Sequence, residues 1–197
     1  MPEKLFMKKI LITSAFLVCL SAISYAQADS AALPAVDKSP MDMSYYPVDY
    51  PVLKISDKVT EAPVARIIYG RPQKSGRPIF GSLVEYEKVW RLGANEATEI
   101  EFYKDVTISD KKIKKGRYTL YAIPSENTWT LIFSKDTDTW GAFKYDIKND
   151  VLRVSVPVIP VNTPVETLCM TFSKISSGCN LVIVWDSAKV ILPVLFK

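Results

Sequence analysis

Two stretches between residues 70 and 98 carry planar, hydrogen-bonding side chains that could converge on one ligand. They contain Arg71, Arg77, Arg91, Asn95 and Glu96. Arginine presents a rigid fork of N–H donors that matches carboxylates, phosphates and sugar hydroxyls. The pattern therefore predicts a site for a small polar ligand, a glycan or a partner protein of the cell envelope. Alternatively, the same groups form an ion-pair network that fixes the two stretches to the domain without any ligand.

Glu96 gives this region a second interpretation, because a carboxylate among arginines can act in a hydrolase or lyase. In that hypothesis the three arginines stabilise developing negative charge. A glycosidase would need a second carboxylate, and Glu99 and Glu101 are the neighbouring candidates. These two alternate on one face of an expected strand, which is typical of a solvent-exposed face. No residue is therefore assigned a catalytic role from the sequence.

Three tryptophans could form a stacking platform for sugars, and their settings differ. Trp129 shares its alternation with Leu131 and Phe133, which favours a place in the core. Trp140 lies in an expected loop, so it is the better candidate for an exposed platform, while Trp90 adjoins the arginine-rich stretches. Aromatic side chains that anchor a core or a loop are the alternative for all three.

The chain contains no histidine, and this absence excludes large classes of chemistry. It rules out Ser-His-Asp and Cys-His nucleophilic mechanisms and every metal site that includes histidine. No glycine-rich nucleotide loop occurs either. We therefore expect no cofactor and no metal.

The formal net charge of +4 is too small for a nucleic-acid-binding face, so no nucleic-acid partner is expected. A basic run does occur at residues 111–115, but it falls at an expected turn between strands. Lysines at such a place indicate a solvated hairpin tip.

Cys169 and Cys179 could form a disulfide if the protein is exported. The alternation of neighbouring apolar residues points Cys169 outward and Cys179 inward. A disulfide needs the two Cβ atoms to face each other, so the pattern does not favour one.

From residue 51 onward, short runs of alternating apolar and polar residues predict about ten strands. Thr98, Ile100 and Phe102, for example, face one way while the residues between them face the other. No segment has the periodicity of an amphipathic helix. The runs lie at 64–69, 98–103, 106–113 (two strands), 117–123, 129–133, 151–158, 166–173, 180–186 and 189–196. This cadence predicts a single all-β domain over residues 51–197, a jelly-roll-like β-sandwich.

The start of the chain is typical of a signal peptide over residues 1–26. Lysines precede an apolar stretch at 10–23, and small residues favour cleavage after Ala26. Val18 before Cys19 argues against lipid attachment, and the stretch is too short for a stable membrane span. We therefore expect a periplasmic or secreted protein. Residues 27–50 are expected to form a tether that ends in an aromatic-rich part packed along the flank of the domain.

Several short motifs resemble those of a bacterial family catalogued as domain of unknown function 2911, which is abundant in Bacteroidetes. The resemblance runs from about residue 51 to the end and rests on Arg71-Pro72, Gly76-Arg77, Ile79-Phe80-Gly81, Val89-Trp90-Arg91, Gly93-Ala94-Asn95-Glu96-Ala97-Thr98, Gly116-x-Tyr118, Ile123-Pro124, Trp140-Gly141-x-Phe143 and Asp150-Val151-x-Arg153-Val154. The resemblance implies export but no particular activity. We therefore expect a non-catalytic binding or envelope-associated module, with the hydrolase or lyase and a purely structural component as the alternatives.

Overall fold

The computed structural model describes residues 35–196. Its contacts divide the chain into two units, Met1–Asp37 and Lys38–Lys197, and the described strands all lie in the second unit. The expected signal peptide and the beginning of the expected tether lie outside the described residues. Within the described part, no helix combines the length and the apolar character needed to cross a membrane.

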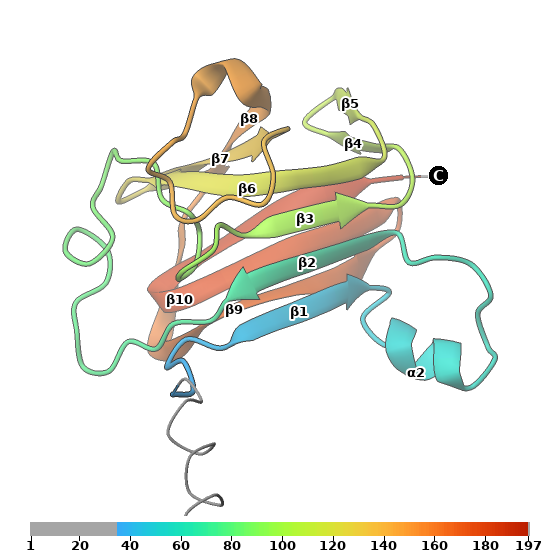
Figure 1. The fold of residues 1–197 in the computed structure, drawn as a ribbon, viewed down its shortest axis with the longest axis horizontal. Helices are drawn as coiled ribbons and strands as arrows, with labels where there is room; N and C mark the ends of the chain where they lie inside the picture. The colour runs from blue at the N-terminus through green and yellow to red at the C-terminus, as the bar shows by residue number, and fades with distance from the viewer. Residues whose placement is uncertain (1–34, 197) are drawn as a thin grey trace, which may run out of the picture. The chain divides into compact units, whose positions relative to one another are not determined.

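Two antiparallel sheets form the sandwich, and they confirm the predicted all-β fold (Figure 1). The six-stranded sheet, which faces the viewer, has the order β1 (Met41–Tyr46), β2 (Ala65–Gly70), β3 (Glu99–Phe102), β6 (Gly116–Pro124), β7 (Thr128–Ser134) and β8 (Asp150–Pro157). The four-stranded sheet has the order β5 (Lys111–Ile113), β4 (Val106–Ile108), β10 (Gly178–Leu195) and β9 (Ile159–Ile175). The long strands β9 and β10 pass behind the first sheet.

Alternating side chains of the two sheets fill the space between them. In β8, Leu152, Val154 and Val156 are buried while the residues between them are exposed. Four aromatic rings with centroids 5.0–6.3 Å apart occupy the core, namely Phe80, Trp90, Trp129 and Trp185. Trp129 therefore lies in the core, as its alternation indicates. The rings from Phe80 and Trp90 also tie the connection between β2 and β3 into the core.

Two elements lie where the sequence showed no regular pattern. Residues 41–46 of the expected flanking segment form β1, which pairs along its whole length with β2 at the edge of the sheet. Helix α2 (Tyr50–Ile55) follows, with Pro51 in its first turn and no buried residue. Proline suits the first turn because its fixed φ is helical and the N–H it lacks has no partner there. A helix of six residues is too short to show a helical period.

Strands β9 and β10 are longer than the runs from which they were predicted. β9 includes Pro160 and Pro164, which break the sequence pattern but are tolerated because β9 is an edge strand. The two runs predicted at 180–186 and 189–196 form one strand, β10, with register shifts around Asp186. Asp186 has a positive φ of 49°. Its Oδ1 atom forms an ion pair with Lys74 Nζ at 2.7 Å.

The two cysteines point to opposite faces of their sheet. Cys179 is fully buried, whereas Cys169 is partly exposed, and both are free thiols. Burial raises the pKa of the Cys179 thiol to about 12.

The basic run at 111–115 forms β5 and the end of the β4–β5 hairpin. Its lysines are exposed to solvent, and Asp105 binds two of them. The Nζ atoms of Lys112 and Lys114 each lie 3.3 Å from Asp105 Oδ2. The backbone N–H of Lys115 donates to the other oxygen of the same carboxylate.

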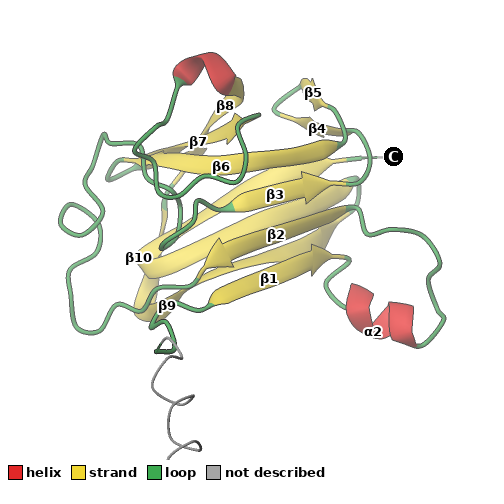
Figure 2. Ribbon diagram, viewed as in Figure 1, coloured by secondary structure: helices red, strands yellow, loops and turns green. Residues whose placement is uncertain are grey.

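Two long connections carry the candidate site residues. Residues 71–98 join β2 to β3, and residues 135–149 join β7 to β8 through the short 3-10 helix η1 (Ile147–Asn149). We call them the 71–98 segment and the 135–149 loop. Figure 2 shows both in green apart from η1, which is red, and the 135–149 loop crosses in front of β6.

Candidate functional site

Backbone hydrogen bonds join the 135–149 loop to the end of the 71–98 segment. Glu96 and Trp140 form an antiparallel bridge between the two. The N–H of Gly141 donates to the Asn95 carbonyl over 3.0 Å, and the N–H of Ala97 donates to the Thr139 carbonyl over 3.0 Å. Three of the six residues predicted for a site, Asn95, Glu96 and Trp140, are therefore brought together.

A small apolar cluster lies beneath the loop, on the outer face of the six-stranded sheet. Its buried members are Ala97, Tyr121 and Ile132. Tyr145 from the loop packs edge-on against Tyr121, with ring centroids 5.2 Å apart. The loop therefore has its own core and is held against β6 and β7.

Arg117 of β6 fixes the middle of the loop electrostatically. Its guanidinium lies 2.5 Å from Asp138 Oδ2 and 3.3 Å from Glu99 Oε2. The hydrogen bond to Asp138 is the main reason that the pKa of Arg117 is raised. Glu99 also accepts a 2.8 Å hydrogen bond from the backbone N–H of Asp138. The two carboxylates are therefore held close together by a shared cation.

Tyr145, Asp150 and Arg153 fix the other end of the loop to β8. The Tyr145 hydroxyl donates to Asp150 Oδ2 over 2.6 Å, and Arg153 Nε donates to the same oxygen over 2.6 Å. Arg153 Nη2 also donates to the Tyr145 hydroxyl. Burial is the main cause that raises the pKa of Tyr145 to about 12. The phenol therefore stays protonated at neutral pH and acts as a structural donor.

The loop surrounds a cavity with a volume of about 510 Å³. We call it the loop cavity. It is lined by Tyr121, Asp136, Thr137, Asp138, Thr139, Trp140, Phe143 and Lys144.

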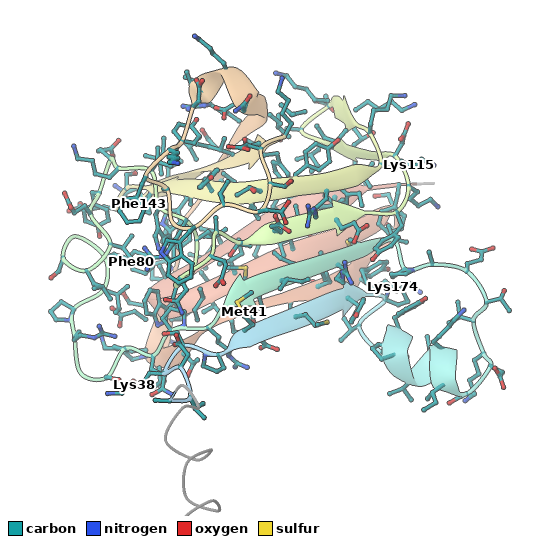
Figure 3. All side chains as sticks on the ribbon, viewed as in Figure 1. Lys38, Met41, Phe80, Lys115, Phe143 and Lys174 are labelled. Atoms are coloured by element: carbon teal, nitrogen blue, oxygen red, sulfur yellow. The ribbon has the colours of Figure 1, made fainter. Side chains whose placement is uncertain are left out.

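A separate cavity of about 700 Å³ lies beside β4 and the end of β10, and none of the predicted site residues lines it. Two aromatic rings of the loop cavity are strongly exposed, with Trp140 at 61% and Phe143 at 86%. Figure 3 labels Phe143 among the loops at the left of the view. The cavity therefore combines exposed aromatic faces with carboxylate, hydroxyl and ammonium groups.

Gly141 lies close beneath the Phe143 ring. Its φ is +67°, a left-handed conformation that favours glycine. A Cβ atom at this position would lie 2.6 Å from the Phe143 ring, closer than any real contact. The Phe143 ring, as it lies in the structure, therefore occupies the space that a side chain at position 141 would need.

A smaller cavity of about 280 Å³ adjoins the loop cavity, since Asp138 and Thr139 line both. Glu96 and Glu99 also line the smaller cavity. Arg117 contacts both Glu99 and Asp138, so its single positive charge offsets only one of these two negative charges. Within residues 35–196, no group of three or more acidic or cysteine side chains is placed to hold a metal ion.

The structure places Arg71 and Arg77 in the framework of the protein. Arg71 donates to the Leu168 carbonyl over 3.1 Å and lies 2.9 Å from Asp42, so it joins β1 and β9. Arg77 donates to the backbone carbonyls of Lys74 and Gln73 within its own turn. These two contacts match the structural alternative considered for the arginines.

Arg91 lies in a different environment from Arg71 and Arg77. It is partly buried between the fully buried Leu92 and the nearly buried Trp90, and burial lowers its pKa. Arg91, Glu96 and Trp140 line three different cavities. Arg91 and Glu96 therefore line different cavities, and the predicted convergence of the arginines on Glu96 is not seen in either.

Sequence reasoning did not identify Phe143, Asp136, Asp138 or Lys144 as site residues. Phe143 carried a signal, because it stands two residues after a glycine that follows Trp140. The two aspartates carried none, because a loop rich in Asp and Thr is typical of any turn.

Comparison with known proteins agrees with the motifs seen in the sequence. Neither the curated proteins nor the solved structures include a match to this chain. A family match covers residues 51–194, from α2 to the end of β10, and includes both the 71–98 segment and the 135–149 loop. The chain therefore belongs to the family described as protein of unknown function (DUF2911).

Proposed function

We propose that the protein is an exported, non-catalytic binding module that takes a sugar-containing ligand in the loop cavity. The observation that carries the proposal is the pair of exposed rings, Trp140 and Phe143, in one cavity with carboxylates. Large aromatic side chains are normally buried, so two exposed in one concave site indicate a binding surface.

The polar lining supports a polyhydroxylated ligand. Asp136 and Asp138 carry acceptor oxygens, and Thr137 offers a hydroxyl. A sugar ring has an apolar face that stacks on an aromatic ring and hydroxyls at its edge that donate to carboxylates. A volume of about 510 Å³ lies within the range of small-ligand sites and suits one or two sugar rings.

The loop is also built to keep its shape before a ligand arrives. Hydrogen bonds fix it to the 71–98 segment, to Glu99 and Arg117, and to β8. A preordered site loses less conformational entropy on binding, so a modest contact area can give useful affinity.

The environment of Glu96 favours binding over catalysis. In the hydrolase or lyase hypothesis, Arg71 and Arg77 would stabilise charge beside Glu96. Both arginines are instead bound to other groups of the framework. Glu96 is exposed at the smaller cavity, whereas Arg91 lines another.

The proposal is tested by calorimetric titration with a panel of defined neutral and acidic oligosaccharides. We expect at least one to bind, and Trp140→Ala and Phe143→Ala to weaken its binding by about tenfold or more. Tyr50→Ala, on α2 away from the cavity, is the control and should leave binding unchanged. Absence of binding across the panel, or binding that survives both cavity variants, would overturn the proposal. Release of shortened sugars that stops in Glu96→Gln would support the enzyme alternative instead.

A further inference from the structure

Arg91 is the arginine whose side chain has no partner in the described part of the chain. Every other arginine there makes a hydrogen bond or ion pair through its guanidinium. For Arg91 no such contact occurs within residues 35–196, and its Nε atom is buried without a hydrogen-bond partner.

An unpaired guanidinium in a partly buried position is unfavourable. Removing a cation from water costs free energy unless a hydrogen bond or an opposite charge replaces the lost hydration. Arginine cannot avoid this cost by losing its proton, because a guanidinium is not deprotonated in proteins. An anion held beside the group would supply the missing interaction.

Arg91 lines a cavity of about 320 Å³. The cavity is lined by Leu83, Val84, Glu85, Lys88, Val89, Trp90, Arg91, Ala142 and Phe143. Six of the nine lining residues are apolar, and the charged ones are two cations and one carboxylate. No ion pair joins Glu85 to Arg91 or Lys88 among the described residues. The cavity therefore carries one excess positive charge on an apolar wall.

We propose that this cavity binds a small ligand made of a carboxylate and an apolar body, with Arg91 holding the carboxylate. The planar fork of a guanidinium matches the two oxygens of a carboxylate. The apolar side chains would cover the rest of the ligand, and a single excess charge matches a monoanion better than a phosphate dianion. Phe143 also lines the loop cavity, but the proposal depends on Arg91 and not on sugar binding.

Calorimetric titration with phenylacetate tests the proposal, with 2-phenylethanol as the uncharged analogue and inorganic phosphate as the doubly charged one. We expect phenylacetate to bind and the two analogues to bind at least about tenfold more weakly. Arg91→Gln should reduce phenylacetate binding by about tenfold or more, and Arg91→Lys should restore only part of it. Equal binding of phenylacetate and 2-phenylethanol, or no binding of phenylacetate, overturns the proposal.

A second variant keeps the test informative if the Arg91 variants fail to fold. Glu85→Gln removes the competing carboxylate, so phenylacetate binding should become about two- to fivefold tighter. A gain in affinity cannot result from misfolding. The exposed Glu87 lies outside the cavity lining, so Glu87→Gln is the matched control and should change nothing. Weaker or unchanged binding in Glu85→Gln overturns the assignment. Trp140→Ala should leave phenylacetate binding intact, which separates this site from the sugar site.

Discussion

The backbone N–H of Asp138 donates a 2.8 Å hydrogen bond to Oε1 of Glu99. Asp138 has a positive φ of 59°, a left-handed conformation that is uncommon for a residue other than glycine. Its side chain is bound at the same time by Arg117, which also contacts Glu99. Glu99 of β3 therefore helps to hold the loop that carries Trp140 and Phe143 in an otherwise unfavourable shape.

Replacing Glu99 with alanine should loosen the 135–149 loop without unfolding the sandwich. A hydrogen bond to a charged acceptor contributes about 1.5–3 kcal/mol, so amides at 136–141 should exchange about tenfold faster or more. Hydrogen exchange followed by mass spectrometry measures this. Glu101→Ala is the control, because Glu101 lies on the same strand and face but binds Arg66. Equal exchange in both variants would contradict the anchoring role of Glu99.

Tyr145→Phe should destabilise the protein by about 1–2 kcal/mol. The change removes a hydroxyl that donates to Asp150 and accepts from Arg153, while the packing on Tyr121 remains. Urea denaturation gives the free energy of unfolding. Tyr50→Phe removes an exposed hydroxyl that donates to the Glu61 carbonyl, and it should cost less than about 0.5 kcal/mol. A cost for Tyr145→Phe as small as that of the control would show that the network contributes little.

Gly70→Ala should be far more destabilising than Gly76→Ala, although only Gly76 has a positive φ, +73°. A Cβ at Gly70 would lie 2.1 Å from the carbonyl oxygen of Ala94, whereas nothing lies within 4 Å of one at Gly76. We expect about 3 kcal/mol or more for Gly70→Ala. Gly76→Ala should cost about 1 kcal/mol for its backbone conformation. Thermal and urea denaturation compare the two, and the reverse order would show that β2 and residue 94 are not so closely packed.

Stability should fall as the pH rises above about 9, in part because of Cys179. Burial raises the pKa of its thiol from 9.0 to about 12, so the unfolded chain loses this proton first. The folded state then binds more protons than the unfolded state, and the free energy of unfolding falls with pH. The slope from one such group is at most about 1.4 kcal/mol per pH unit. Below pH 9 this contribution is constant.

Urea denaturation from pH 8 to pH 10.5 in the wild type and in Cys179→Ala isolates the thiol. The tyrosines with raised pKa values remain in both proteins, so the difference in slope reports Cys179 alone. We expect a shallower decline in the variant between about pH 9 and pH 10.5. Parallel curves would contradict a buried, neutral thiol.

Strand alternation predicted most of the sandwich because it depends on local sequence. Ile100, Trp129 and Cys179 all point inward, as their neighbours indicate. The pattern did not predict β1, because an edge strand with one partner and little burial shows weak alternation. It also began β9 too late, because prolines indicate a break unless the strand is known to lie at an edge.

The candidate site was predicted less well, because its members meet through tertiary contacts. Asn95, Glu96 and Trp140 were named from the sequence, and backbone pairing joins them. The arginines looked alike in sequence but have different roles. Arg71 binds Asp42 of an unpredicted strand, and Arg91 faces a cavity closed partly by Phe143 from a distant loop. Nothing local distinguishes these two environments.

The position of β10 between β4 and β9 constrains how the domain assembles. β4 precedes β5, β6, β7, β8 and β9 along the chain, yet its neighbour across the sheet is β10. The four-stranded sheet cannot form until residues 178–195 have left the ribosome, and the core rings of Phe80 and Trp90 lack their partner Trp185 until then. A topology of such high contact order folds slowly. A nascent chain of this protein should therefore stay open, and within reach of chaperones, until synthesis of this domain is almost finished.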